Sequence, residues 1–474
     1  MANLNVLSER YATEKINDLF SERANVIDER KLWVVVLKAQ REMGVGIPAE
    51  DITKYEGAIN NVDLELIKQI EDVRGHDVKA RIEAFVKAAG AEEHIHKGMT
   101  SRDVTDNVEQ ARFKKASEII FGKYVSVLRH FVEKAEEYSL ELTGRSHHQA
   151  AQLTLLGRRF SMWAEELHSN LPNFENFIEK YPLRGIKGPV GTRFDMLTLL
   201  ESRDNVDRLE KIVAKHLGFS EILDSPGQVY PRSLDYALLS QLSLLSSACE
   251  NFAKGMRLMA GHELVTEGFK EGRVGSTAMP HKMNTSRSER ICSAAELLKM
   301  YAGGGSRLSG DQWEEGDVSC SLVRRVVIPD AFYASDAVCE TSLTVLNEMG
   351  AYPLMISKEV DRYLPFLATT EILMTAVQKG IGREKAHSII KEHAISEALR
   401  MRQKGVPPYL AKRLSEDADF KEAGITEETI NSILADKAHF IGDAELQINR
   451  VVKKTQNLLD RYEQESLYEP EKIR

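Results

Sequence analysis

The amino-acid sequence predicts an all-α protein that is built around a bundle of long helices. Apolar residues recur at helical spacing over long stretches, whereas the alternation of apolar and polar residues that indicates strands is rare. Two of the long helical segments are apolar around most of their circumference. A helix of this kind is buried in a multi-helix bundle or at a subunit interface, which favours long central helices.

Three long helices are predicted along the middle of the chain. The first is predicted to begin after Thr105-Asp106-Asn107, because such residues cap helix N-termini and an acidic first turn follows. Its apolar stripe extends to about Ala135. A second helix covers about residues 234–264, and a third covers about residues 328–348. The glycines at 303–305 follow no clear strand and lack the lysine of a phosphate-binding loop, so they predict an ordinary loop.

Helix lengths and chain breaks divide the sequence into three predicted domains. A chain of 474 residues is long enough for about three. We predict an N-terminal helical domain at 1–107, a central long-helix domain at 108–355 with a loop near 267–286, and a C-terminal helical domain at 356–474. In the last domain, glycines and the pair Pro407-Pro408 interrupt shorter amphipathic helices.

The charge balance excludes some classes of partner. The net charge of −9 argues against general binding to nucleic acid or to membrane surfaces. No apolar run approaches the roughly 20 residues that span a bilayer, and the N-terminus lacks the basic and apolar segments of a signal peptide. The four cysteines are far apart in the sequence and predict reduced thiols. We therefore expect a cytoplasmic protein without a nucleic-acid or membrane partner.

The stretch from Gly275 to Asn284 reads G-S-T-A-M-P-H-K-M-N and predicts a functional loop. Its small polar residues and its proline disfavour a helix, and its hydroxyl, lysine and amide groups suit contact with an anion. It resembles the signature loop of the fumarase/aspartase superfamily, G-S-S-x-M-P-x-K-x-N, and departs from it at Thr277. Enzymes of that superfamily release fumarate by breaking a C–N or C–O bond.

The resemblance implies roles for three residues of this loop. Ser276 aligns with the catalytic base of the superfamily, which removes a proton from the carbon beside a carboxylate. The product of this step is a dianionic aci-carboxylate, which fixed cations and hydrogen-bond donors must stabilise. Lys282 and Asn284 are the right residue types for that. We expect Ser276 to lose its own proton only in a closed, water-poor loop.

Residues 144–154 contain two adjacent histidines, His147 and His148. Both cannot face one site on a regular element, and His147 taken alone would more often be structural than catalytic. The segment resembles the superfamily's T-H-x-Q-x-A-Q-x-T region, which implies that His147 protonates the departing nitrogen. Ser146 and Gln149 are then expected to orient this histidine or to bind the substrate.

Successive hydroxyl groups at Thr100 and Ser101 lie just ahead of a predicted helix. Hydroxyls and backbone N–H groups in this position form a site for a carboxylate. The alternative is a role in helix capping alone, and the two roles are compatible. The segment resembles the superfamily's G-x-T-S…D-N region, which implies that Thr100 and Ser101 hold the succinyl carboxylate of a substrate.

Several segments resemble the adenylosuccinate lyase family in particular. Residues 8–12 are similar to its S-R-Y-A segment, which implies that Arg10 and Tyr11 contact a nucleotide phosphate. Residues 187–192 are similar to its K-G-x-x-G-T turn, and Gln228 is similar to a substrate-binding glutamine.

The segment Arg74-Gly75-His76-Asp77-Val78 resembles the family's R-H-D-V sequence. The resemblance implies that His76 orients the phosphate side of the substrate and assists catalysis, and that Asp77 binds the substrate. Gly75 occupies the place of the family's arginine.

A later segment, Q-W-E-E-G-D-V-S-C-S followed by R-R, resembles the family's Q-W-x-E-R…S…R-R region. Ser321 and Arg325 align with residues that bind the substrate phosphate or ribose. Gly316 occupies the place of a second family arginine, and Arg287 and Arg290 are expected to compensate for the missing cations.

These matches run from Ser8 to about Pro365, so the chain is identified as similar to the adenylosuccinate lyase family. That implies a β-elimination of fumarate from adenylosuccinate, or from the succinyl-carboxamide ribotide SAICAR to give AICAR, without cofactor or metal. It also implies a homotetramer with shared active sites. His94 and His96 would bind zinc only with a further ligand that no neighbouring motif supplies. A sister lyase acting on argininosuccinate, malate or aspartate and a catalytically inactive helical scaffold are the alternatives.

Overall fold

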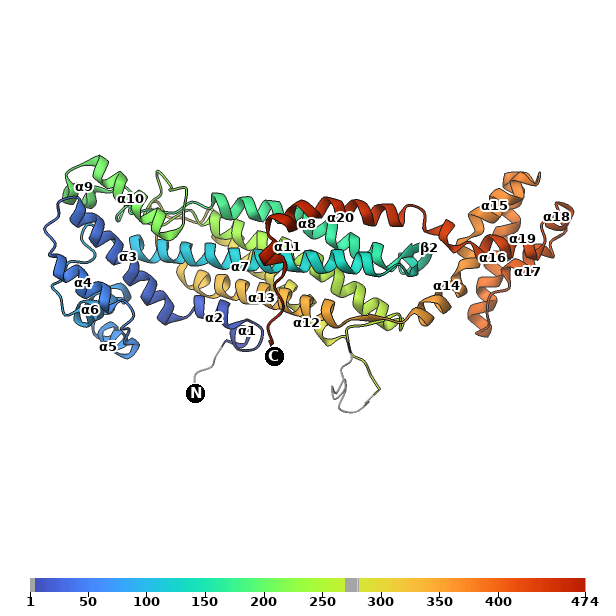
Figure 1. Ribbon diagram of the computed structural model, residues 1–474, viewed down its shortest axis with the longest axis horizontal. Coiled ribbons are helices and arrows are strands. Elements are labelled where there is room, and N and C mark those ends of the chain that lie inside the picture. The colour runs from blue at the N-terminus through green and yellow to red at the C-terminus, as the bar shows by residue number, and fades with distance from the viewer. Residues whose placement is uncertain (1–4, 269–278, 280, 474) are drawn as a thin grey trace.

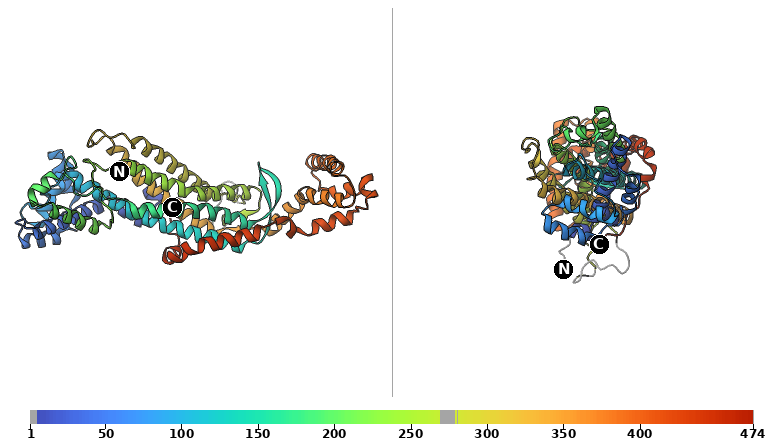
Figure 2. Two further views of the ribbon diagram at one scale, coloured as in Figure 1. Left: turned by 90° about the horizontal axis from the view of Figure 1, so that it is seen from above. Right: turned by 90° about the vertical axis from the view of Figure 1, so that its left-hand side faces the viewer.

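The computed structural model describes residues 5–268, 279 and 281–473, and it confirms the all-α prediction. The molecule is elongated, with long helices running side by side through its middle and smaller groups of helices at its two ends (Figure 1, Figure 2). None of the helices in these ranges combines the length and the apolar character that a membrane span requires.

The largest hydrophobic core lies inside the central bundle. Aromatic rings from three helices meet there, since the ring of Phe252 lies 5.3 Å from the rings of both Phe131 and Trp163. Rings at this spacing stabilise the packing beyond the burial of their apolar area. The bundle consists of α7 (Ser101–Glu137), α8 (Leu156–Lys180), α11 (Ser233–Gly261), α12 (Ser286–Leu308), α13 (Ser321–Glu348), α20 (Ala444–Arg461) and the short α21 (Glu463–Ser466).

A second core joins the helices at the N-terminal end of the molecule, where Trp33, Tyr55 and Phe85 pack together. This end lies at the left of Figure 1. It contains α3 (Glu22–Glu42), α4 (Ala49–Ala58), α5 (Leu64–Arg74), α6 (Asp77–Ala89), α9 (Phe194–Leu200) and α10 (Arg203–Leu217), while α1 (Val6–Arg10) and α2 (Glu14–Leu19) lie along the bundle.

The opposite end has a small core of its own. The chain then returns through α20 to the central bundle (Figure 1). The predicted boundary at 107/108 falls inside α7, and the three domain ranges stay a prediction. The end unit contains α14 (Pro353–Leu367), α15 (Thr369–Gln378), α16 (Arg383–Lys404), α17 (Leu410–Ser415), α18 (Ala418–Glu422), α19 (Glu427–Ala435) and the 3₁₀ turn η1 (Lys437–Ile441).

In the described residues, two short antiparallel pairs of strands accompany the helices, and they were not predicted from the sequence. β1 (Glu141–Ser146) pairs with β2 (Gln149–Leu155), with a register irregularity after Gly144. Much of β2 is exposed, so neither of its faces has to be apolar throughout. Apolar and polar residues therefore do not alternate clearly here. β3 (Val265–Thr266) pairs with β4 (Gly350–Ala351) beside the root of the signature loop.

The start of α7 differs from the prediction. The helix begins at Ser101 rather than after Asn107, because Thr100 caps it and forms a capping box with Asp103. The residues expected to form the cap, Asp106 and Asn107, are instead buried inside the helix.

The loop predicted at glycines 303–305 is wrong, because these residues lie within α12. Gly305 lies tightly against α11, where an added Cβ would come within 2.5 Å of Leu239 Cδ1. Close packing between two long helices explains at least this glycine, and α11 and α13 occur where long helices were predicted.

A buried ion cluster joins the central helices to both chain ends. Lys123 on α7 contacts Asp336 and Glu340 on α13, with 2.7 Å between Lys123 Nζ and Glu340 Oε1. The Thr13 hydroxyl donates to Asp336, and the Tyr468 hydroxyl donates to Glu340. Each buried charge therefore has an opposite charge beside it, as burial requires.

Candidate active site

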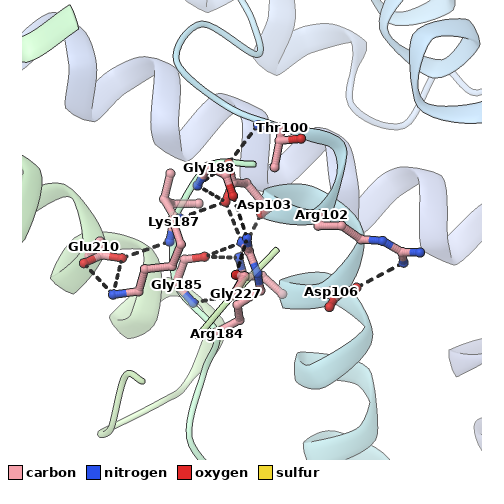
Figure 3. Close-up of polar contacts among 12 residues, drawn as sticks. Thr100, Arg102, Asp103, Asp106, Arg184, Gly185, Lys187, Gly188, Glu210 and Gly227 are labelled. Carbon is pink, nitrogen blue, oxygen red and sulfur yellow. Dashed lines mark hydrogen bonds and ion pairs between the residues drawn. The ribbon is translucent and has the colours of Figure 1, made fainter. Parts of the chain in front are cut away.

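The carboxylate of Asp103 organises the N-terminal end of α7 (Figure 3). It is fully buried and accepts the backbone N–H of Thr100 at 2.8 Å. It also accepts the N–H groups of Lys187 at 2.8 Å and Gly188 at 3.0 Å. The guanidinium of Arg184 lies 2.5 Å away and balances the charge. A helix N-terminus is thereby locked to a turn more than eighty residues away in sequence.

Arg184 extends this network to a third segment. Its Nη2 donates to Gly188 O at 3.0 Å and to Gly227 O at 3.3 Å, next to Gln228. The N–H of Gln228 in turn donates to Glu315 O at 2.7 Å. One hydrogen-bonded network therefore connects the segments of three predicted substrate-binding residues, Thr100, Ser101 and Gln228.

A second group lies near the start of α12. The guanidinium of Arg290 lies 5.0 Å from the ring centre of Tyr11, and that of Arg10 lies 6.0 Å from it. Burial lowers the pKa of Arg290, and the charges of Arg287 and Arg10 lower it further. Cations gathered around a phenol in this way suit an anionic group.

The carboxylate of Glu267, buried at the root of the signature loop, fixes the first turn of α12. It accepts the N–H groups of Arg287 and Ser288, each at 3.0 Å, and the Ser288 hydroxyl. A carboxylate at this place also interacts favourably with the helix dipole. The sequence analysis did not single out Glu267, because its partners lie about twenty residues further along the chain.

A third group contains His76, Asp77 and Arg325. His76 caps α6, and its Nδ1 accepts the Lys79 N–H at 3.3 Å. Asp77 Oδ2 lies 3.5 Å from Arg325 Nη2, and Ser321 lies one turn before Arg325 on α13. Burial opposes ionisation of Asp77, but the Val78 N–H and the charges of Arg81 and Arg325 outweigh it and lower its pKa. The Asp77 carboxylate is thus held ionised.

The backbone explains both glycines that replace family arginines. Gly75 ends α5 with a φ of +65°, and Gly316 has a φ of +127°. Side chains rarely adopt such angles, and a Cβ at 316 would also lie 2.6 Å from Val229 Cγ2. Arg74, one place earlier, pairs with Glu83 at 2.9 Å.

His147 and His148 occupy the tip of the β1–β2 hairpin. Their φ angles are +51° and +61°, so both central residues of this two-residue turn are left-handed. Asn-Gly is the usual choice there, and each histidine stores strain of about 1–3 kcal/mol. Ser146, His147 and Gln149 are all exposed, and an ion pair between Arg145 and Glu359 holds the hairpin against α14. The strained turn therefore holds the His147 side chain at the surface of the subunit, exposed to solvent.

Lys282 and Asn284 are exposed in the segment that precedes α12. The backbone N–H of Lys282 donates to Met279 O at 3.0 Å. Ser276 lies outside the described residues.

The length of α7 separates the candidate groups at its two ends. The helix has 37 residues and is about 55 Å long at the usual rise per residue. Thr100 precedes its first residue, and the hairpin of His147 follows its last. Figure 1 shows β2 and α6 at opposite ends of the bundle. Within one chain, His147 therefore cannot meet the groups around Thr100 or His76.

The histidines considered for zinc have other partners. His94 Nε2 lies 3.1 Å from Asp51 Oδ2, and His96 Nδ1 accepts from Trp33 Nε1 at 3.1 Å. Over the part of the chain that the structure describes, no three potential ligands among His, Cys, Asp and Glu are grouped to hold a metal.

Comparisons with known proteins agree with this architecture. Residues 10–296 match the family described as lyase, and residues 365–451 match the family described as adenylosuccinate lyase C-terminus. The adenylosuccinate lyase of Saccharomyces cerevisiae is 33% identical, over 95% of this chain and 94% of that protein. That of Schizosaccharomyces pombe is 32% identical, over 94% and 93%.

Solved structures share the fold at low identity. The 3-carboxy-cis,cis-muconate lactonizing enzyme of Pseudomonas putida gives a TM-score of 0.81 at 17% identity and covers 96% of this chain and 99% of its own. A fumarate lyase of Mesorhizobium sp. BNC1 gives 0.78 at 16% identity, covering 94% and 99%.

The match over residues 10–296 identifies the chain as a lyase, and the long helical bundle agrees with the fold of the solved structures. Two findings identify the family within this class. Residues 365–451 match the adenylosuccinate lyase C-terminus, and two adenylosuccinate lyases are more than 30% identical over nearly the full length. The chain belongs to the adenylosuccinate lyase family. The predicted family, fold class and lyase class are confirmed.

Asp103→Asn should lower the free energy of unfolding by about 3–5 kcal/mol, because it leaves the Arg184 charge buried without its partner. Asp207→Asn is the matched control, since it breaks an exposed pair with Arg193 and should cost under about 1 kcal/mol. Urea unfolding followed by circular dichroism measures both. Equal losses would contradict the central role given to Asp103.

Proposed function

We propose that the protein cleaves adenylosuccinate to AMP and fumarate, and SAICAR to AICAR and fumarate, in purine nucleotide biosynthesis. The observation that carries this proposal is similarity to two adenylosuccinate lyases over nearly the whole of each chain. The match to the C-terminal family model supports it, because that model is particular to these lyases.

The reaction we propose is a β-elimination. Ser276 removes a proton from the β-carbon of the succinyl group, and the electron pair of the broken C–H bond forms the dianionic aci-carboxylate. Lys282 and Asn284 stabilise that dianion through charge and hydrogen bonding. The C–N bond then breaks as His147 protonates the departing nitrogen. Acid, base and fixed charges suffice for these steps, so we expect neither a cofactor nor a metal.

The substrate carboxylate is assigned to Thr100 and Ser101. Free N–H groups at the start of a helix attract anions, and α7 is a long helix whose first turn Asp103 holds in place. Gln228, joined to the same network through Arg184, is assigned to the substrate as well.

The nucleotide phosphate is assigned to Arg10, Tyr11 and Arg290, which already lie together around the Tyr11 ring. Other described candidates lie in two further places. Ser146 and Gln149 flank His147 on the hairpin. Asp77 lies 3.5 Å from both His76 and Arg325, and Ser321 lies one turn before Arg325 on α13.

We further propose a homotetramer in which each active site draws residues from several subunits. The length of α7 supports this, because one chain holds its candidate groups too far apart. Exposed apolar side chains on the bundle supply surfaces for other copies. These side chains, each about half exposed or more, are those of Met162, Leu244, Leu258, Met300, Leu322 and Val326. We expect the assembly to work in the cytoplasm without nucleic-acid or membrane partners.

The first experiment adds adenylosuccinate to the purified protein in the presence of a chelator and follows the ultraviolet change as AMP and fumarate form. Prompt turnover supports the proposal, and Ser276→Ala serves as the inactive control. Turnover of argininosuccinate, malate or aspartate alone would identify a sister lyase. A folded tetramer that releases fumarate from none of them would be an inactive scaffold.

His147→Ala should lower kcat by about 10²–10⁴, the range expected when a general acid is removed. His148→Ala is the matched variant, because it lies in the same strained turn with the same exposure. It should keep most of the activity. Steady-state rates of fumarate release measure both, and equal losses would refute the choice of His147.

Mixing two inactive variants tests the sharing of sites. Ser276→Ala and His147→Ala subunits, dissociated together and reassembled, should regain part of the wild-type activity, because some sites then receive both intact residues from different chains. Each variant taken alone through the same treatment is the control. If the mixture stays as inactive as its components, the two residues act from one chain.

A further inference from the structure

A small cavity lies beside the group of His76, Asp77 and Arg325. It has a volume of about 300 Å³, opens to the surface, and is lined mainly by residues of α3, α6, α7 and α13. Glu29 of α3 lines it and is fully buried. Burial disfavours the charge of a carboxylate, so its partners decide whether it stays ionised.

The contacts of Glu29 are unequal. Its Oε1 accepts Arg81 Nη1 at 2.6 Å and Asn25 Nδ2 at 3.1 Å. Its Oε2 is buried and makes no hydrogen bond. The carboxylate is thus held on one side only, by a cation that comes from a different helix.

Arg81 connects Glu29 to the substrate-binding side. It lies one turn after Asp77 on α6, and its charge lowers the pKa of Asp77. Asp77 lies 3.5 Å from Arg325 and, through its other oxygen, 3.5 Å from His76 Nδ1. Glu29 and Asp77 therefore both act on the charge of Arg81, Glu29 through an ion pair at 2.6 Å and Asp77 from one turn earlier on the same helix.

Glu29 titrates near neutrality. Burial raises its pKa from 4.5 to about 7, the charge of Arg81 opposes this rise, and the charge of Asp77 adds to it. The charged groups that line the cavity with Glu29 come from α6 (Asp77 and Arg81), α7 (Glu109 and Arg112), α13 (Arg324 and Arg325) and the start of α3 (Glu22).

We propose that Glu29 is a positioning residue for the substrate-binding side of the site: by holding Arg81, it leaves the Asp77 carboxylate to orient Arg325. The inference rests on the proposed function, which assigns Asp77 and Arg325 to the substrate. When Glu29 gains a proton, Asp77 becomes the stronger partner of Arg81 and its contact with Arg325 weakens. Substrate binding then weakens as well.

The test compares wild type and Glu29→Gln in adenylosuccinate turnover from pH 6 to 8.5. Wild-type KM should rise by about tenfold toward pH 6, the scale of coupling between groups in contact. Glu29→Gln should show the high KM at every pH, with kcat within about twofold of wild type at each. Glu22→Gln is the control, because Glu22 lines the same cavity but is exposed, and it should follow wild type.

A second readout follows titration without substrate. The folded state binds the Glu29 proton more tightly than the unfolded chain, so this residue's contribution to stability falls as pH rises from about 4.5 to about 7. Glu29→Gln lacks that loss, and its Tm relative to wild type should increase over the same interval. Neutral Gln is tolerated here, because Glu29 itself is neutral below this range.

The outcomes separate the two proposals. Wild type without turnover of adenylosuccinate would overturn the proposed function, and the role of Glu29 would fall with it. Turnover with the same pH dependence of KM in Glu29→Gln and wild type would overturn the role of Glu29 alone. A Tm difference that does not change with pH would do the same.

Discussion

The structure depends above all on the buried carboxylate of Asp103. Four donors converge on it, three of them backbone N–H groups and one the guanidinium of Arg184. Each donor would be costly to bury alone, so removing the carboxylate would leave several groups unsatisfied at once. The start of α7 and the turn at residues 185–188 share this one acceptor, and Arg184 links the Gly227 segment to it by donating to the Gly227 carbonyl, which is why segments so distant in sequence keep fixed relative positions.

The length of α7 turns this local network into a constraint on the whole molecule. A rigid helix of 37 residues carries one candidate group at each end, and the bundle packed around it prevents bending. The proposed acid on the hairpin and the proposed carboxylate site beside Thr100 can then meet only between copies of the chain. Exposed apolar side chains along α11, α12 and α13 provide surfaces that such copies could bury. In the proposed assembly, the helices that pack against other copies also set the distance between the candidate catalytic groups.

Sequence reasoning succeeded where the signal is local or the motif long. Periodicity predicted the long helices, and the ten-residue pattern ending at Asn284 indicated the superfamily. It missed the capping box of Thr100 with Asp103, although that contact is local. It failed where a partner is remote: Gly305 lies in a helix, and the reason for a glycine there is the close approach of Leu239 from α11. The pairing of Glu29 with Arg81 joins residues 52 positions apart, and no short pattern indicates it. The candidate site residues themselves stay predictions.

The adjacent arginines Arg324 and Arg325 show how burial decides which cations can serve a substrate. Neighbours on a helix point about 100° apart, so one faces the core and the other faces outward. The Arg324 side chain is 4% exposed and contacts Asp235 and Glu109, whereas that of Arg325 is 63% exposed and lies 3.5 Å from Asp77. Withdrawing Arg324 to bind a phosphate would leave Asp235 buried without its charge partner, a cost that binding would have to exceed. Arg325 carries no such cost. With glycine at 75 and 316, we expect anion binding at this end of the chain to depend on cations that are partly exposed and weakly paired.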